Sequence, residues 1–267
     1  MKKVLVAFLM IALLVSLCAC SVPAGSFMGR AQVNSLVKKY GTPQAELTIK
    51  YEAGADKVVV KVTYDLLLDK APLAVTRFIQ IANEGGYEDT FIDQLETTYK
   101  TYMVMGRYAK DEVDSKKYYD LRSADVAFAG EFESNKYRQP KGGYAEFKMF
   151  SLAMYHENVG EKFDSANGTL ILSLSSQTRL NSADYAVFAE FQSMTVYVNE
   201  KQTYSYTKVD PSVLANLQSF TTATSHDVYK KDNPNTTTSN VKIISAEPTL
   251  SVKILGDSDW SKLPTIR

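Results

Sequence analysis

The sequence predicts a mostly β fold, a barrel of strands capped by helices, and three observations support this prediction. Tyrosine outnumbers phenylalanine by 17 to 12, and threonine, valine and isoleucine are abundant; residues of these kinds favour strands over helices. Many short apolar segments have the length or the alternation of strands. Only one segment, early in the chain, has a strong helical period.

The N-terminus predicts export and a lipid anchor. Lys2 and Lys3 precede an apolar run of 14 residues over 4–17, which is shorter than the roughly 20 residues of a membrane-spanning helix. The run is therefore interpreted as part of a signal peptide. It ends in Leu17-Cys18-Ala19-Cys20, which resembles the bacterial lipobox. The resemblance implies lipidation of Cys20 and attachment to the extracytoplasmic face of the cell membrane; an ordinary signal peptide cut near Ala24 is the alternative.

The rest of the chain is expected to form one domain with two insertions. The predicted division is a signal peptide at 1–19, a lipidated tether at 20–45, a folded domain at 46–256 with insertions at about 108–141 and 196–240, and a C-terminal tail at 257–267. Residues 30–40 carry apolar side chains at helical spacing and predict a short helix within the tether. A solvated stalk is the alternative for that segment.

Two predicted strands open the domain, and the clearest helix follows them. Residues 46–51 and 57–67 are predicted as strands joined by a turn-prone connection. Residues 69–86 are predicted as a helix, because Pro72 suits a first turn and an apolar stripe recurs at helical spacing. Gly85-Gly86 is expected to end the helix, since glycine adopts the left-handed conformation without strain.

The later segments are mostly predicted strands. They are 102–105, 168–175, 185–191, 241–245 and 250–255, with a hairpin at 196–207. The charged, tyrosine-rich residues 108–141 are expected to be helical or irregular, with Glu131 and Glu133 solvated. Residues 208–240 are expected to form a polar insertion with a helix at 211–220.

Charge and the inventory of reactive side chains exclude several classes of function. The 30 basic residues are balanced by 30 acidic ones, whereas nucleic-acid-binding proteins normally have a basic excess. Cys18 would leave with the signal peptide and Cys20 would carry lipid, so the mature domain has no thiol for a disulfide, a zinc cluster or a nucleophile. His156 and His226 are far apart, and no metal site is expected. Neither G-x-S-x-G nor H-E-x-x-H occurs, which argues against the common hydrolases.

Several segments resemble motifs of the cyclophilin family, and they occur in the family's order. Residues 69–78 read DKAPLAVTRF, similar to D-x-A-P-x-T-V-x-N-F, and residues 85–90 read GGYEDT, similar to G-x-Y-x-x-T. Residues 167–173 resemble the R-G-T-L-S-M-A strand, 185–191 the V-F-G-x-V strand and 241–245 the last strand. The resemblance therefore spans most of the predicted domain.

The resemblance implies both a fold and an activity. The fold is a closed antiparallel barrel of eight strands capped by two helices, the second of which is expected after Phe191. The activity is peptidyl-prolyl cis–trans isomerisation of proline-containing peptides or exported proteins, and it needs no cofactor. An X–Pro bond isomerises slowly because its C–N bond has partial double-bond character. A catalyst therefore needs an apolar pocket for the proline ring and a hydrogen-bond donor that acts most strongly on the twisted bond.

The family's catalytic arginine lies in an F-H-R-V motif, and this chain differs there. Residues 92–95 align with that motif and read IDQL, so Gln94 occupies the arginine position. Glutamine lacks the fixed positive fork of arginine, and a charge-assisted hydrogen bond is roughly twice as strong as a neutral one. The loss is expected to lower the rate by a factor on the order of 10²–10³, unless Arg107 or Arg179 substitutes.

The proline pocket is expected to follow Gln94 in the chain. Residues 102–107 align with the family's F-M-x-Q-G-G, which makes Tyr102, Met103 and Met105 pocket candidates. Tyr185 aligns near the histidine that precedes the V-F-G strand, and it is the fourth candidate.

One strand of the family has no clear partner in this sequence. Its S-Q-F-F-I strand and its tryptophan would lie between Ser173 and Phe188, which only 14 residues separate. Residues 182–187 are an alternative for that strand, which would shift the later alignment.

Three functions remain open from the sequence. The first is a membrane-anchored isomerase that assists the folding of exported proteins. The second is a cyclophilin-fold binding protein with impaired catalysis, which the replacement at Gln94 favours. The third is a lipoprotein that binds another ligand through its two insertions, because insertions of this size are often functional.

Overall fold

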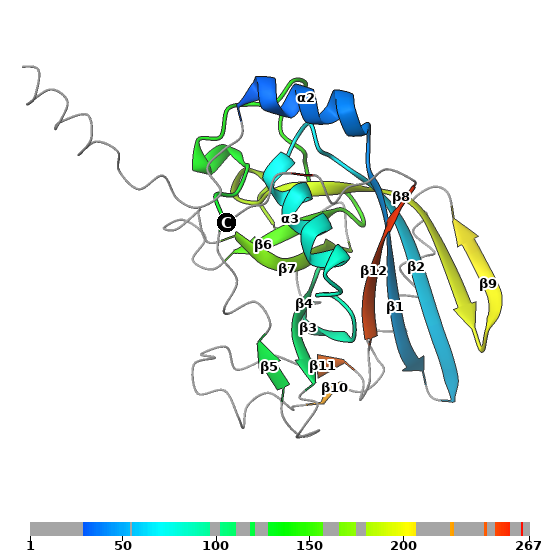
Figure 1. The fold of residues 1–267 in the computed structure, drawn as a ribbon. Coiled ribbons are helices and arrows are strands. Elements are labelled where there is room, and N and C mark those ends of the chain that lie inside the picture. Colours follow the sequence, from blue (N-terminus) through cyan, green and yellow to red (C-terminus); the bar gives the residue numbers. More distant parts are fainter. Residues whose placement is uncertain are drawn as a thin grey trace, which may run out of the picture.

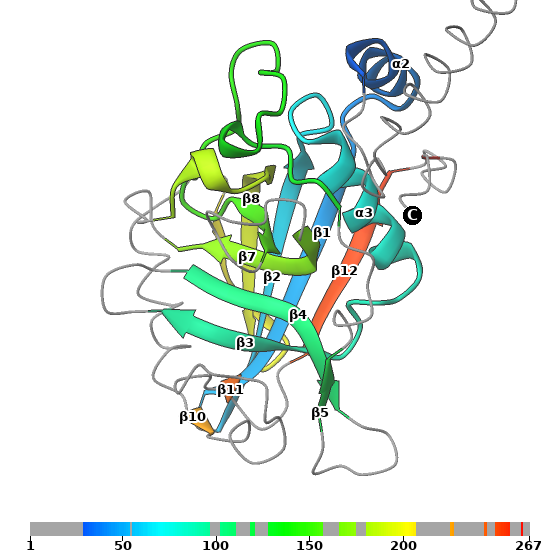
Figure 2. The same cartoon turned by 90° about the vertical axis from the view of Figure 1, so that its left-hand side faces the viewer.

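Eight antiparallel strands close into a barrel (Figure 1, Figure 2). In this computed structural model the described residues are 29–53, 55–96, 102–110, 118–120, 128–156, 166–174, 180–206, 225–226, 243–244, 249–256 and 263. Around the barrel the order is β2 (Asp56–Leu66), β1 (Gln44–Ala53), β12 (Thr249–Leu255), β3 (Thr90–Glu96), β4 (Tyr102–Lys110), β7 (Ala166–Ser173), β6 (Leu152–His156) and β8 (Val187–Val198). Pairing of β2 with β8 closes the ring. The predicted mostly β fold with an eight-stranded barrel is confirmed.

Shorter strands add to the barrel without belonging to the ring. β9 (Lys201–Tyr206) pairs with the end of β8, and β5 (Tyr118–Asp120) pairs with β4. β10 (Ser225–His226) and β11 (Ile243–Ile244) form a separate two-stranded sheet. The predicted hairpin at 196–207 is the outer part of β8 and β9, which extends past the barrel in Figure 1.

The hairpin of β1 and β2 shows why this sequence forms a barrel wall. Val58, Val60 and Val62 are buried, whereas the residues between them are half-buried. Alternation of this kind places every second side chain on the same face of a strand. Opposite them on β1 lie Ile49 and Leu47, which pair with Val60 and Val62 and are also buried. The apolar face of the hairpin therefore points into the barrel.

The main helix is shorter than the sequence predicted. α3 (Pro72–Asn83) begins with proline at its first turn, and the residues after it form turns that include Gly85 in the left-handed region at φ 71°. Phe78 lies in the core with its ring centre 5.5 Å from that of Tyr87 and 5.0 Å from that of Phe188. The helix is thereby fixed against the barrel (Figure 1).

The turn after α3 gives a physical meaning to the G-x-Y-x-x-T resemblance. The Tyr87 hydroxyl donates a buried hydrogen bond of 2.7 Å to the carbonyl of Gly168 on β7. The Thr90 hydroxyl donates to the carbonyl of Tyr87 at 2.8 Å. Gly85, the tyrosine and the threonine thus connect the helix to the barrel and lead the chain into β3.

Another α-helix precedes the first strand of the barrel in the chain. α2 (Arg30–Tyr40) confirms the short helix predicted for residues 30–40, and Val33 and Leu36 pack into the main core. Part of the segment predicted as a tether therefore packs against the core. Directly after Phe191, where the second helix was expected, the chain continues as β8 to Val198.

A strand that the sequence did not predict completes the barrel. β6 lies between β7 and β8 in the sheet. Residues 182–184 form the short 3₁₀ helix η2 (Ser182–Asp184) and not the missing strand. In the family, the R-G-T-L-S-M-A strand and the S-Q-F-F-I strand both precede the V-F-G strand, just as β6 and β7 precede β8 here. Residues 167–173 lie in β7, the second of the two strands. The comparison with R-G-T-L-S-M-A therefore placed them one strand too early.

The closing strand is also later in the chain than the resemblance implied. β12, at residues 249–255, lies between β1 and β3, whereas residues 243–244 pair with β10. In the insertion at 108–141 the described structure is the end of β4, β5 and the 3₁₀ helix η1 (Glu133–Asn135). The helix predicted at 211–220 lies outside the described residues, as do residues 1–28 with Cys20.

None of the described helices has the length and apolar character that a membrane crossing requires.

Glu131 caps α3 from a distant part of the chain. Its Oε1 accepts a hydrogen bond of 2.7 Å from the backbone N–H of Leu73, and its Oε2 accepts one of 2.9 Å from Ala74. Glu131 is only 3% exposed, so the prediction that it is solvated is wrong, whereas Glu133 is exposed as expected. The first N–H groups of a helix have no partner within the helix, and Ala71 at the N-cap offers no side-chain acceptor. The two carboxyl oxygens of Glu131 supply the missing acceptors.

Removal of the Glu131 carboxyl group is expected to destabilise the fold. Glu131→Ala leaves two buried N–H groups without an acceptor, and the free energy of unfolding should fall by about 1–3 kcal/mol. Glu133→Ala is the matched control and should change it by less than about 0.5 kcal/mol. Urea unfolding of both variants at pH 6 tests this. Equal stabilities would contradict the capping role.

The stability should also depend on pH through Glu131. Burial raises the pKa of Glu131 to about 8, while the N–H groups of Ala74 and Leu73 act to lower it. The folded protein therefore holds a proton between pH 4.5 and 8 that the unfolded chain releases, and the free energy of unfolding falls as pH rises through this window. Glu131→Gln should lack this part of the slope. A wild-type slope equal to that of the glutamine variant would contradict the raised pKa.

Candidate functional site

Paired residues on five neighbouring strands form a row across the wall of the barrel, and this row starts at Gln94. Gln94 on β3 pairs with Val104 on β4, and Val104 pairs with Ile171 on β7. Ile171 pairs with Ala153 on β6, which in turn pairs with Val187 on β8. Residues directly opposite each other in antiparallel strands lie on the same face of the sheet. The row therefore connects the arginine position of the resemblance to the middle of the wall.

An apolar cluster separate from the main core surrounds this row. We name it the outer cluster; its buried members are Phe147, Ala153, Ile171 and Val187, and Tyr102, Ala145, Tyr155, Leu180 and Tyr185 pack against them half-buried. Five of its members come from strands of the wall, and the segment before β6 and the loop before β8 supply the rest. An apolar surface with hydroxyl groups at its edge is suited to an apolar ligand with a few polar groups.

The structure places the four predicted pocket residues on two different faces. Tyr102 and Tyr185 belong to the outer cluster. Met103 and Met105 are 0% exposed and belong to the main core, where their backbone partners Leu172 and Leu170 are also buried. Successive residues of a strand point to opposite faces, so the two methionines line the inside of the barrel and not a pocket on the outer face.

Tyr185 packs against two other rings at the edge of the outer cluster. Its ring centre lies 5.8 Å from that of Phe147 and 4.9 Å from that of His156. Burial raises the pKa of Tyr185 to about 12, and Tyr102, Tyr155 and Asp184 act in the same direction. The hydroxyl therefore stays protonated, and remains a hydrogen-bond donor, throughout the physiological pH range.

His156 is a site neighbour that sequence reasoning missed. It is 1% exposed at the end of β6, and its ring stacks on Phe132 with centres 5.3 Å apart. Its Nε2 donates to the backbone carbonyl of Asp184 at 2.5 Å. A single histidine gives no sequence signal of burial, and the short strand that carries it has no clear alternation of apolar and polar residues.

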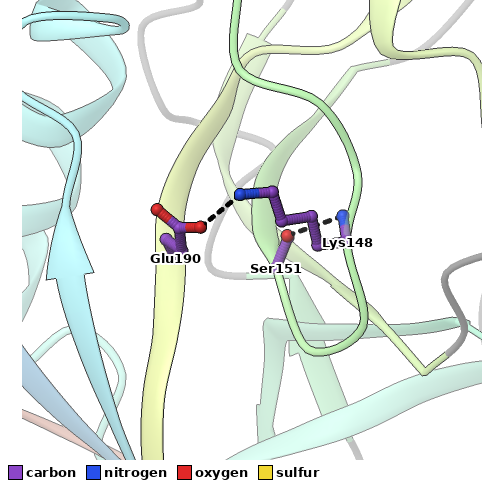
Figure 3. Close-up of polar contacts among 3 residues, drawn as sticks. All are labelled: Lys148, Ser151 and Glu190. Carbon is purple, nitrogen blue, oxygen red and sulfur yellow. Dashed lines mark hydrogen bonds and ion pairs between the residues drawn. The ribbon is translucent and has the colours of Figure 1, made fainter. Parts of the chain in front are cut away.

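A hollow of about 300 Å³ adjoins the outer cluster and shares Ala145 and Val187 with it. Figure 3 shows three polar residues of its lining. Lys148 Nζ lies 2.5 Å from Glu190 Oε1, and the backbone N–H of Lys148 donates to Ser151 Oγ at 2.9 Å. These contacts fix the segment before β6 against β8, although an exposed ion pair of this kind contributes at most about 1 kcal/mol.

The remaining predicted site residues are only partly described. The backbone of Gln94 is described within β3 and that of Arg107 within β4, while Arg179 lies outside the described residues. Within the described part of the chain, no three His, Asp or Glu side chains gather as metal ligands would.

The placement of Met103 in the core can be tested by its contribution to stability. Met103→Ala should lower the free energy of unfolding by about 2–5 kcal/mol, because it removes a fully buried side chain. Met149→Ala removes the same atoms from a half-buried position and should cost less. Chemical denaturation of the two variants measures both values. A cost below about 1 kcal/mol for Met103→Ala would place Met103 at an open surface.

Comparison with known proteins matches the chain to one family. A family model described as "Cyclophilin type peptidyl-prolyl cis-trans isomerase/CLD" matches residues 55–246. No curated protein sequence matches the chain. Among solved structures, a cyclophilin from Cryptosporidium parvum is 13% identical over 78% of this chain and 97% of its own, with a TM-score of 0.41. The Mimivirus cyclophilin is 13% identical over 84% of this chain and 94% of its own, with a TM-score of 0.42.

The same Cryptosporidium parvum cyclophilin has also been crystallised in the presence of the dipeptide Ala-Pro; that structure is 14% identical over 77% of this chain and 98% of its own, with a TM-score of 0.40. The family match extends from the turn between β1 and β2 to just beyond β11 and covers well over half of the sequence. The chain therefore belongs to the cyclophilin-type peptidyl-prolyl cis–trans isomerase family.

Proposed function

We propose that this protein is a membrane-anchored, extracytoplasmic peptidyl-prolyl isomerase that acts on proline-containing segments of exported proteins. The observation that carries the proposal is the outer cluster, an apolar surface in register with position 94. The proline ring would pack on its half-buried members, such as Tyr102, Tyr155 and Tyr185, which cover the buried aliphatic side chains. Burial of apolar surface would supply most of the binding free energy.

Uncharged hydrogen-bond donors would stabilise the twisted amide in place of arginine. The side-chain amide of Gln94 and the hydroxyl of Tyr185 can each donate a hydrogen bond to the rotating amide. Such donors accelerate the reaction only insofar as they bind the twisted bond more tightly than the planar one. Because both are uncharged, turnover is expected to be slower than with arginine by a factor on the order of 10²–10³.

The alternative is a peptide-binding cyclophilin domain without useful catalysis. The specific observation in its favour is again the replacement of arginine by Gln94. The two functions share the outer cluster as the binding surface. They differ only in whether a bound proline isomerises faster than a free one.

Exchange NMR on X–Pro peptides with residues 21–267 separates the two functions. Wild type should accelerate exchange, and Gln94→Arg should raise its rate by a factor on the order of 10²–10³. Tyr185→Phe should lower the wild-type rate by about 2- to 10-fold, because it removes one neutral hydrogen bond. Tyr197→Phe, on β8 but outside the outer cluster, is the matched control and should leave the rate unchanged.

Each outcome of this assay has a distinct meaning. Peptide binding by the wild type with acceleration only in Gln94→Arg would favour the binding protein over the isomerase. Neither binding nor acceleration in any folded variant would contradict both functions, and the insertions would then become the candidate contact surface.

The membrane anchor predicts a specific modification. Intact-mass spectrometry of the protein expressed with its own N-terminus should give a mature chain that starts at Cys20 and carries lipid. Cys20→Ala should abolish the lipid mass, whereas Cys18→Ala is the matched control and should retain it. A mature chain that starts near Ala24 without lipid would show an ordinary signal peptide instead.

A further inference from the structure

A second hollow, of about 600 Å³, lies between α2 and the segment 136–141. We name it the basic hollow. Its lining includes four cationic side chains and a single acidic one, Asp69; the four are Arg30, Lys136, Arg138 and Lys141. It shares no lining residue with the outer cluster or with the hollow beside it.

None of these four cations forms an ion pair with another residue in the described part of the chain. All four are exposed, and the one side-chain contact among them is a hydrogen bond of 3.4 Å from Arg30 to the carbonyl of Gln139. Two other lysines do form ion pairs, Lys61 with Glu46 at 3.2 Å and Lys148 with Glu190 at 2.5 Å. Four like charges around one hollow repel one another, and an anion bound there would relieve that repulsion.

The N-terminus of α2 adds to the positive potential of the hollow. Gly29 and Arg30 line it, the N-cap has no side-chain acceptor, and the first turn has no acidic residue. A helix N-terminus carries a partial positive charge of about half an elementary unit. The backbone and the four side chains therefore attract the same kind of ligand.

The length of the tether indicates which anion would be available. Ten residues lead from Cys20 to Arg30, and an extended chain of that length reaches at most about 36 Å. With Cys20 held in the bilayer, the start of α2 cannot be farther than this from the membrane surface. The basic hollow lies at that end of the domain, so the headgroup layer of the membrane is always within its reach.

We propose that the basic hollow is a docking site for the anionic headgroups of phospholipids. The proposal rests on the proposed function only for the lipid anchor, which holds the domain near the membrane. Docking fixes the domain against the bilayer at α2 and leaves the outer cluster open to exported chains. The attraction is local, because the chain as a whole is electrically balanced, and loss of Lys2 and Lys3 with the signal peptide makes the mature domain slightly acidic.

Vesicle sedimentation of unlipidated residues 21–267 tests the docking directly. The described fold starts at residue 29, so this chain keeps every described contact. It should bind vesicles of phosphatidylglycerol and phosphatidylcholine at low salt, should not bind phosphatidylcholine alone, and should be released by 0.5 M salt (about a 4 Å screening length). The triple variant Arg30→Gln, Arg138→Gln, Lys141→Gln should bind about 10- to 100-fold more weakly.

A matched variant removes the same charge from the far end of the barrel. Lys50, Lys57 and Lys201 are exposed beside the turns that join β1 to β2 and β8 to β9, at the end away from α2 (Figure 1). Their replacement by glutamine should leave vesicle binding within about twofold of wild type, since screening at low salt still confines the attraction to a few tens of ångströms.

Three results would overturn the proposal. The first is that the wild type does not bind anionic vesicles, and the second is that the two triple variants weaken binding equally. The third is that a short polyglutamate peptide releases the protein from the vesicles when the concentration of glutamate charges is lower than that of charged lipid headgroups. The last result would identify an acidic protein segment as the occupant. None of these measurements uses isomerisation or lipidation, so failure of the docking is distinct from failure of the proposed function.

Discussion

Closure of the barrel by the pairing of β2 with β8 is the constraint on which the other features depend. A closed sheet has an inside and an outside, and each strand must send alternate side chains to one or the other. Along β4 this assigns Met103 and Met105 to the core and leaves Tyr102 in the outer cluster. The same rule along β7 places Leu170 and Leu172 inside and Ile171 outside. The candidate site exists because the wall has a second apolar face here, outside the main core.

Closure also explains why the first N–H groups of α3 are capped by a residue that is distant in the sequence. The helix lies against a ring that is already complete, so its first turn cannot take acceptors from a strand edge. Glu131 reaches that turn from the segment between β5 and β6, and the neighbouring backbone is shaped to permit it: a side chain at Gly130 would approach the ring of Phe132 to 2.0 Å. Glycine at this position lets Phe132 fold over the backbone and stack on His156. One short segment therefore caps the helix and supports the rim of the site.

Sequence patterns predicted the parts of this fold that local rules determine. The β1–β2 hairpin, α2 and most of α3 follow from alternation, helical spacing and the positions of proline and glycine. β6 was missed because its five residues carry no alternation that differs from a loop with apolar residues. The inward methionines were assigned to a pocket because a motif match fixes which residues align and does not fix which face they occupy. The cap at Glu131 had no sequence signal, since its partners are 57 and 58 residues away.

The replacement of arginine at position 94 changes what the site requires of its surroundings. A fixed charge stabilises a twisted amide even near water, because a charge-assisted bond tolerates some competition from solvent. Neutral donors are effective only where water is excluded, since their hydrogen bonds gain strength in a low-dielectric environment. The outer cluster provides part of such an environment: Tyr185 is half-buried, and its ring packs between Phe147 and His156. A cyclophilin site without arginine therefore depends on its aromatic surroundings, and the density of rings around Tyr185 is the feature that would allow catalysis to persist.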